Sequence, residues 1–344
     1  MRKIDMRKIK TQNAVGYTIC HDITRITKDA GADVWFKKGH VIKECDIDHL
    51  ISIGKEDIYI YENIEGMIHE EEGAGILYDI CKNTHIYPTD VTEGKIEAVA
   101  DIAGLLKVDI ERLQAINEQG DIIIATLHNN TVVAKDQKIA GMRIIPLLAE
   151  KSKLETVKRI AGHEPILQIK PFYQFSVAVI TTGNEIYYNR TPDTFTPVIE
   201  KKLAAFNLKI DYHKIVEDDV TKIVSAIKGV ISQGATLIIC TGGMSVDPND
   251  LTPTAIKEAG ANILTYGAPV LPGSMLLIGY IQNNIPILGL PGCVMYRDAT
   301  GFDLFLPRIL ARDAISKKEI AKIGHGGFCR KCETCGFPHC EFGR

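Results

Sequence analysis

Three short glycine turns in the second half of the chain carry the residue types that bind phosphate. They are TTGNE (181–185), TGGMS (241–245) and LPGC (290–293), and each follows an apolar run typical of a buried strand. Glycine lets backbone N–H groups approach an anion closely, and a following helix adds further N–H donors and a positive dipole end. One such turn more often only tightens a strand end. Three turns at one edge of a sheet favour a phosphate site.

Carboxylates lie beside two of these turns. Asp247 and Asp250 follow the Gly-Gly turn, and Glu185 closes the first turn. Acid groups next to an anion cradle suit a divalent cation shared with the anion, so we expect Mg²⁺ and treat all three as catalytic candidates. The alternative is local: Asp247 caps a turn ahead of Pro248, and Asp250 caps the next helix.

The glycine turns belong to a regular alternation of strands and helices. Apolar runs at 175–183, 235–240, 275–281 and 285–290 predict strands, whereas 218–234 and 303–312 predict helices, the first of them capped by Asp218 or Asp219. This pattern predicts an α/β domain over 170–318, with a three-layer, mostly parallel sheet. Ligands of such sheets bind outside the carboxyl ends of the strands, where the turns lie.

The first half of the chain is less regular. It predicts an N-terminal α+β region over 1–165, either one region or two modules divided near 62–66, with helices at 45–54, 74–83 and 109–117. The polar stretch 150–171 is the best domain boundary. His21 and Asp22, in CHDITRI, either reach a pocket or make a local hydrogen bond.

The last residues, 319–344, form a cysteine-rich tail. Cys329, Cys332, Cys335 and Cys340 follow the spacing C-x2-C-x2-C-x4-C, which indicates a metal site. Zinc is the first choice and a [4Fe–4S] cluster the alternative. We expect the metal to order this tail, so removal of residues beyond about Gly324 should leave the α/β domain folded.

Bulk composition excludes several classes of protein. The 344 residues are 45% hydrophobic and 24% charged, with a net charge of −3. No Lys/Arg block and no apolar run of membrane-spanning length occur, so neither nucleic acid nor a membrane is expected as a partner. We expect a cytoplasmic homodimer.

Four motifs, in this order, carry a family resemblance: TTGNE, TGGMSVDPND, GAPVLPGSM and GLPGCVMY. Together they resemble the molybdopterin-binding domain of molybdopterin molybdotransferases and adenylyltransferases, over roughly 176–310. The resemblance implies that the Gly-Gly turn and Ser245 hold the terminal phosphate of molybdopterin or its adenylate, and that Asp250 acts on the metal or the phosphate. It implies this set of cofactor-binding residues: Thr182, Gly183, Thr241, Gly242, Gly243, Ser245, Pro272, Gly273, Ser274, Pro291, Gly292 and Cys293.

Two departures from the family pattern bear on activity. The basic KPGKP turn of the insertion enzymes is LPGSM here (271–275), without lysine, which weakens anion binding. GLPGNP is GLPGCV, so Cys293 is either a thiol whose pKa the helix start lowers, able to touch the dithiolene or molybdenum, or a small buried filler.

Three functions are compatible with these features. The first is molybdenum insertion or adenylation of molybdopterin by a transferase. The second is a non-catalytic carrier or sorting protein that delivers the cofactor to a partner molybdoenzyme. The third is a pocket for another phosphorylated small molecule.

Overall fold

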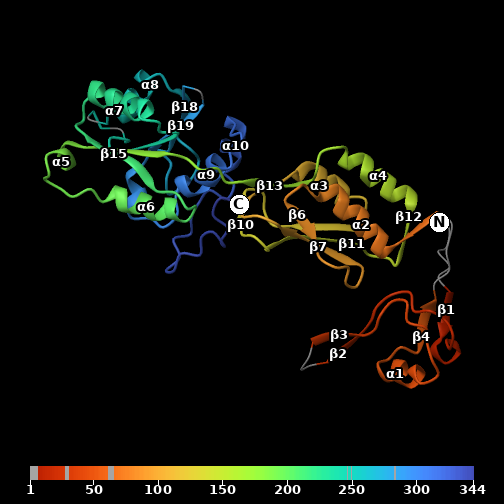
Figure 1. The fold of residues 1–344 in the computed structure, drawn as a ribbon. Coiled ribbons are helices and arrows are strands. Elements are labelled where there is room, and N and C mark those ends of the chain that lie inside the picture. Colours follow the sequence, from red (N-terminus) through yellow and green to blue (C-terminus); the bar gives the residue numbers. More distant parts are fainter. Residues whose placement is uncertain (1–6, 28–30, 61–65, 246, 249, 283) are drawn as a thin grey trace. The chain divides into compact units, whose positions relative to one another are not determined.

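The computed structural model describes residues 7–344, except 28–30, 61–65, 246, 249 and 283. The chain divides into two compact units (Figure 1). Unit 1 comprises residues 1–102 and 106–169, and unit 2 comprises residues 103–105 and 170–344. No helix in the described ranges is long and apolar enough to cross a membrane.

The N-terminal part of unit 1 has a small apolar core of its own. Two antiparallel strand pairs and a short helix surround it: β1 (Arg7–Lys10) with β4 (Asp57–Ile60), β2 (Ile23–Thr27) with β3 (Gly31–Phe36), η1 (Thr11–Asn13) and α1 (Asp46–Ser52). The core consists of Ala14, Ile19, Ile23, Phe36, Ile42, Leu50 and Ile58. The helix predicted at 45–54 is therefore confirmed, in a slightly shorter form.

The rest of unit 1 packs helices against antiparallel sheets. Its main sheet has the order β6-β7-β11-β9 and its helix α2 packs on β7 and β11. The elements are β5 (Met67–His69), α2 (Glu70–Cys81), β6 (Ile86–Pro88), β7 (Lys95–Ala100), β8 (Gly104–Val108), α3 (Ile110–Asn117), β9 (Ile122–Thr126), β10 (Thr131–Val133), β11 (Lys138–Ile144), β12 (Leu148–Glu150), α4 (Lys151–Ala161) and β13 (Leu167–Pro171). The polar stretch 150–171 is a helix and a strand, because α4 buries Leu154, Val157 and Ala161 on one face.

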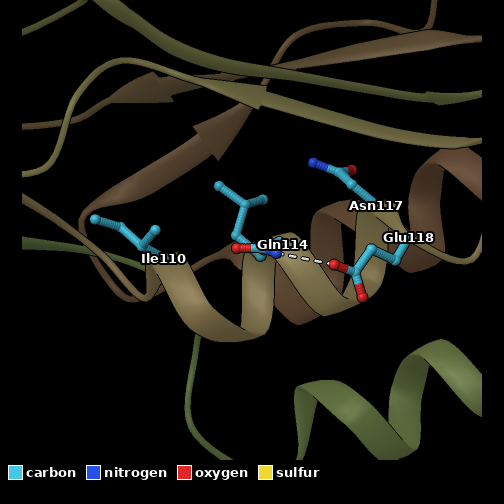
Figure 2. Close-up of a pocket in the computed structure, with 5 residues that line it drawn as sticks. Ile110, Gln114, Asn117 and Glu118 are labelled. Carbon is cyan, nitrogen blue, oxygen red and sulfur yellow. Dashed lines mark hydrogen bonds between the residues drawn. The ribbon is translucent and has the colours of Figure 1, made fainter.

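A shallow hollow lies along α3 (Figure 2). Ile110, Leu113, Gln114, Asn117 and Glu118 line it, and Gln114 Nε2 donates to Glu118 Oε1 at 2.9 Å. One carboxylate and two amides give this surface no catalytic or metal-binding set.

Unit 2 is built on a six-stranded sheet with the order β15-β14-β16-β19-β18-β17. The strands are β14 (Val177–Thr182), β15 (Ile210–Val216), β16 (Leu237–Thr241), β17 (Asn262–Tyr266), β18 (Leu277–Ile281) and β19 (Ile285–Leu290). Parallel pairing joins β15, β14, β16 and β19, and β18 pairs antiparallel with both β19 and β17. The predicted α/β class and mostly parallel sheet are confirmed.

Helices cover both faces of this sheet, which gives three layers. Val177, Val179, Leu237 and Ile239 face a core shared with α6 and α9, whereas the alternate residues face a core shared with α7 and α8. The helical segments are α5 (Asn184–Tyr187), α6 (Phe195–Ala204), α7 (Val220–Ser232), α8 (Thr252–Glu258), η2 (Gly292–Met295), α9 (Gly301–Leu310) and α10 (Lys317–Lys322). The cap predicted for the helix at 218–234 is Asp219, which accepts from Lys222 N at 2.9 Å.

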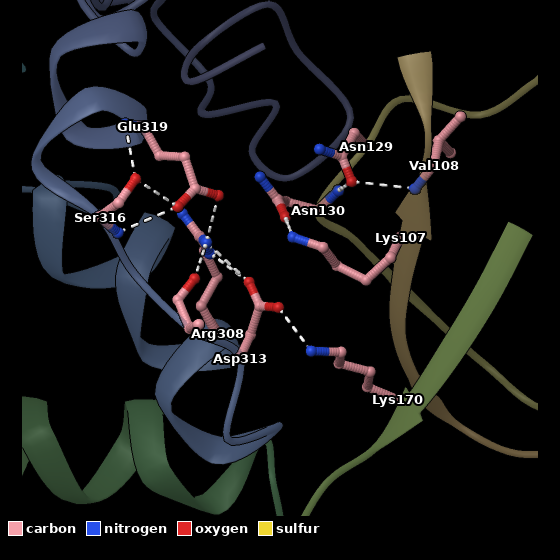
Figure 3. Close-up of polar contacts among 10 residues, drawn as sticks. Lys107, Val108, Asn129, Asn130, Lys170, Arg308, Asp313, Ser316 and Glu319 are labelled. Carbon is pink, nitrogen blue, oxygen red and sulfur yellow. Dashed lines mark hydrogen bonds and ion pairs between the residues drawn. The ribbon is translucent and has the colours of Figure 1, made fainter. Parts of the chain in front are cut away.

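A buried arginine joins the last two helices (Figure 3). Arg308, 2% exposed, donates to Asp313 Oδ2 from Nε at 2.8 Å and pairs with Glu319 Oε1 at 2.7 Å. Lys170 Nζ contacts the other Asp313 oxygen at 2.8 Å. A buried charge without partners is costly, so this network fixes α10 on the end of α9.

Candidate functional site

The three glycine turns meet at one edge of the six-stranded sheet. Thr181 pairs in register with Thr241, and Thr241 pairs with Leu290, so β14, β16 and β19 end side by side. The turn from Leu271 to Ser274 leads into β18, whose first residue Leu277 pairs with Gly289 at the same edge. The structure therefore brings together the turns that the sequence singled out.

Glycine is required where two of these turns touch. Gly242 has φ +82°, and a Cβ at this position would overlap the carbonyl oxygen of Thr182. Gly243, at φ +54°, would place a Cβ 2.9 Å from Thr252 Oγ1. Side chains other than hydrogen are thus excluded by conformation and by space. The first and second turns pack backbone against backbone.

Two residues that the sequence analysis did not assign to the site hold the Gly-Gly turn in place. Thr252 Oγ1 donates to Gly242 O at 2.9 Å and lies 3.0 Å from Thr182 Oγ1. Tyr266 Oη donates to Met244 O at 3.1 Å and to Ser245 O at 3.3 Å. Thr252 is the first residue of α8, and Tyr266 lies in β17, and neither belongs to a local motif that points to a site.

Thr241 has a buried hydroxyl with no hydrogen-bond partner within the described part of the chain. Its register neighbour Thr181 differs, because its hydroxyl lies 3.2 Å from both Asp193 Oδ2 and His213 Nε2. A buried polar atom without a partner costs free energy unless a ligand or water satisfies it. The Thr241 hydroxyl is therefore a candidate donor to a bound anion.

Three carboxylates at this edge, those of Asp218, Glu185 and Asp250, are close enough for their charges to interact. Burial raises the pKa of Asp218, and the charges of Glu185 and Asp250 raise it further. Asp218 Oδ2 accepts from Asn184 N at 3.0 Å, next to Glu185. Its sequence position suggested only a helix cap, a role that Asp219 takes, so Asp218 is a candidate site residue that the sequence did not point to.

Asp247 and Asp250 hydrogen-bond to each other within the Gly-Gly turn. Asp250 Oδ2 accepts from Asp247 N at 2.9 Å, and Asp250 N donates to Asp247 O at the same distance. Asp250 does not cap α8, whose N-cap is Leu251. In the described ranges no three His, Cys, Asp or Glu side chains are placed to hold a metal ion, so an Mg²⁺ site is not shown.

The turn at Gly273 packs against the start of α9, and its backbone lies near Cys293 of the last turn. Gly273, at φ +110°, would place a Cβ 2.5 Å from Gly301 N, and Gly301 N donates to Pro272 O at 3.2 Å. Burial raises the pKa of the Cys293 thiol more than the Gly273 backbone and the charge of Arg297 lower it. The raised pKa favours the buried-filler alternative, because desolvation of Cys293, the second residue of a four-residue 3₁₀ turn, outweighs any effect of the turn start.

Backbone pairing and a buried aromatic ring attach the cysteine tail to unit 2. Leu271 N donates to Gly327 O at 2.8 Å and Cys329 N donates to Leu271 O at 2.9 Å. Phe342 is 4% exposed within the core that contains α9. These contacts attach the tail to the core of unit 2, and the ordering of the tail by a metal stays a prediction.

The four thiols of the tail line one cavity of about 460 Å³. Cys332 and Cys335 are exposed, whereas Cys329 and Cys340 are half-buried. They are not gathered into a metal-holding group where the structure describes them, so the predicted zinc or [4Fe–4S] site is not supported.

His21 and Asp22 make local contacts in unit 1. Asp22 Oδ1 accepts from Lys38 N at 2.9 Å, and His21 Nδ1 lies 3.4 Å from Cys20 Sγ. Burial lowers the pKa of His21. These contacts fit the local hydrogen-bonding alternative.

Comparison with known proteins finds two family matches in the chain. Residues 178–311 match the family described as "Probable molybdopterin binding domain", and residues 8–62 match a domain of unknown function (DUF8806). The molybdopterin molybdenumtransferase of Staphylococcus epidermidis is 28% identical over 140 residues, which is 38% of this chain and 32% of that protein. A molybdenum cofactor biosynthesis bifunctional protein of Synechococcus elongatus is 35% identical over 83 residues, 24% of this chain and 26% of that protein.

These matches cover a limited part of each relative. The chain spans between about a quarter and a third of the length of both proteins. Among solved structures, the molybdopterin biosynthesis enzyme MoaB of Thermus thermophilus aligns with 40% of this chain and 92% of its own, at 23% identity and a TM-score of 0.33. Residues 178–311, which carry the converging glycine turns, are thus similar to the family described as "Probable molybdopterin binding domain".

Proposed function

We propose that this chain binds molybdopterin or its adenylate at the carboxyl edge of the six-stranded sheet. The observation that carries the proposal is the Gly-Gly turn, in which the buried Thr241 hydroxyl has no partner among the described residues. Backbone N–H groups of the turn would bind the terminal phosphate, with Thr182, Gly183, Ser245 and the Pro272–Ser274 turn around it. The match of residues 178–311 to the molybdopterin-binding family supports a pterin ligand.

A transferase is the first candidate activity. In molybdenum insertion or adenylation, Mg²⁺ would neutralise the phosphate charge, and Asp250, Asp218 and Glu185 would hold it, directly or through water. The repulsion of Asp218 by the charges of Glu185 and Asp250, which raises its pKa, supports this role, because a bound cation would offset that repulsion. Asp247, exposed in the same turn, would position Asp250.

A carrier or sorting role is the second candidate. The turn from Leu271 to Ser274 has no cationic side chain, and Leu271 uses both its N–H and its carbonyl to pair with the tail. A site with less positive charge at the ligand binds without stabilising a charged transition state as strongly. In that role the chain would pass its cofactor to a partner molybdoenzyme. We also propose a homodimer in the cytoplasm, for which sedimentation of the purified chain tests the assembly state.

Binding is tested with a pair of threonine variants. Thr241→Val removes the unpartnered hydroxyl and should weaken molybdopterin binding about tenfold, because a hydrogen bond to a charged group is lost. Thr181→Val is the matched control at the register neighbour: it should leave binding within a few-fold and destabilise unit 2 by about 1 kcal/mol. Anaerobic calorimetry measures both. Equal binding by Thr241→Val and the wild type would place the ligand elsewhere.

Catalysis is tested with Asp250→Asn, which removes charge and little volume. If the chain is a transferase, this change should lower Mg²⁺-dependent molybdenum insertion or adenylation on the order of 100-fold while molybdopterin binding stays. Wild-type protein that binds the ligand but turns over neither reaction supports the carrier role. Elemental analysis of the same protein tests the zinc or iron–sulfur prediction for the tail.

A further inference from the structure

The cavity of the cysteine tail adjoins the turns of the pterin site. Its lining includes Pro272 from the turn before β18 and Arg297 to Ala299 from the segment after η2, in addition to the tail. Arg297 N donates to Cys293 O at 3.0 Å, and the Arg297 charge acts on the Cys293 thiol. Arg297 thus lines this cavity and also contacts the last glycine turn.

Charge and donor groups in the cavity favour an anion. Its cations are Arg297, Arg330 and Lys331, and its carboxylates are Asp298 and Glu341. Arg330 and Glu341 pair at 2.7 Å and neutralise each other. The remaining charged residues of the lining are two cations, Arg297 and Lys331, and one carboxylate, Asp298. Thiols add weak S–H donors and polarisable surface without charge. This set can bind an oxyanion through two cations that no carboxylate holds in the described structure.

The tail is held rigidly enough to form such a wall. Gly327 lies against the Pro269 carbonyl, where a Cβ would overlap the oxygen, and Gly343 N donates to Gly326 O at 2.9 Å, so the two ends of the tail meet. Together with the buried Phe342 ring, these contacts close the tail into a loop. A cavity of about 460 Å³ within that loop is in the size range of small-molecule sites.

We propose that the tail cavity binds a tetrahedral oxyanion, with Arg297 and Lys331 as its cationic ligands, beside the pterin site. The oxyanion is either a metal oxyanion such as molybdate or a phosphate group, which share shape and charge. The proposal rests on the proposed function for the neighbouring ligand and extends it. It gives the transferase or carrier a second ligand site, formed by the tail.

Equilibrium dialysis of the full chain tests this site with molybdate and inorganic phosphate as separate probes. Arg297→Gln and Lys331→Gln should each weaken oxyanion binding about tenfold, since each removes one charged hydrogen-bond partner. Lys318→Gln, an exposed lysine of α10 outside the cavity lining, should leave binding unchanged. Preference for molybdate identifies a metal oxyanion, and preference for phosphate identifies a phosphate group.

Two outcomes would overturn the proposal. The first is no saturable binding of either anion by the wild type. The second is equal binding by the wild type, Arg297→Gln and Lys331→Gln, with circular dichroism showing all three folded. Failure of the pterin site is separate, because it appears as unchanged molybdopterin binding by Thr241→Val. Oxyanion binding without pterin binding would retain the second site and refute the first.

Discussion

The glycine-turn edge and the cysteine tail both look like ligand sites in the sequence, but the structure treats them differently. At the edge, β14, β16 and β19 end in register, and their turns pack together. In the tail, four closely spaced thiols line one cavity without gathering around a point, as far as the structure describes the chain. Sequence proximity of ligands is therefore weaker evidence than a backbone conformation that only glycine can adopt.

The two regions differ because the position of the glycine turns is fixed locally, whereas the position of the cysteines depends on distant contacts. Gly242 is needed because of its own φ and of the Thr182 carbonyl, and sheet register fixes that carbonyl. Cysteine side chains in a loop have no such fixed register. Their positions depend on Leu271 and on the α9 residues against which Phe342 packs, and both lie far from the cysteines in the sequence.

The largest expected effect is on the stability of unit 2 when the tail loses its buried ring. Phe342→Ala removes a buried ring from the core of unit 2 and should cost about 3–5 kcal/mol in the unfolding free energy of that unit. Phe328→Ala is the control in the same tail: its ring is 70% exposed, and its removal should change stability by about 0.5 kcal/mol or less. Denaturant unfolding measures both. A Phe342→Ala protein as stable as the wild type would mean that the tail is independent of the core, as the sequence alone predicted.

A smaller effect on stability is expected when glycines of the turns at the sheet edge are replaced. Gly242→Ala places a Cβ against the Thr182 carbonyl at φ +82° and should destabilise unit 2 by about 2–3 kcal/mol and abolish molybdopterin binding. Gly292→Ala, in the last turn, has no atom within 4 Å of the added Cβ and should be neutral or stabilising by about 0.5 kcal/mol. Thermal unfolding and calorimetry check the pair. If both variants behave alike, close packing of the turns does not define the site.

Much of unit 2 could be predicted from the sequence because its strands are buried and its helices amphipathic. The runs that became β14, β16, β18 and β19 are continuously apolar, and α7 repeats its apolar residues at helical spacing. The edge strand β15 was missed, because most of its side chains are polar and exposed.

The candidate site residues also fall into a group that local sequence reveals and a group that it does not. Those set by backbone geometry, the glycines, could be identified from local motifs. Thr252, Tyr266 and Asp218 could not, because their roles come from contacts between segments: Tyr266 reaches the turn from β17, and Asp218 meets Asn184 across the ends of β14 and β15. The direction of the Cys293 pKa also needed the structure, since burial by distant residues outweighs the local turn.

The smallest effect concerns the carboxylate that the sequence left as a helix cap. Burial, with the charges of Glu185 and Asp250, raises the pKa of Asp218 above its ordinary 3.8, so the folded state binds the proton more tightly than the unfolded state. The stability contributed by protonation is present below 3.8 and is lost as pH rises through the folded pKa. Asp218→Asn keeps an oxygen that can accept from Asn184 and removes the charge. The unfolding free energy of the variant should therefore rise relative to that of the wild type as pH increases from 3 to 7, by about 0.5 kcal/mol.

Asp219→Asn is the matched control for this last prediction, because the pKa of Asp219 is lowered whereas that of its neighbour Asp218 is raised. Hydrogen bonds from Thr221 and from the backbone of Lys222 lower the pKa of Asp219, so its contribution to stability is present at neutral pH and is lost as pH falls. The Asp219→Asn protein should be less stable than the wild type at pH 7 and should approach it at pH 3. Urea unfolding across this range measures the two slopes. Opposite slopes at these adjacent carboxylates would show that Asp218 shares the acidic edge of the candidate site and that Asp219 serves the helix, whereas equal slopes would mean that Glu185 and Asp250 do not act on Asp218.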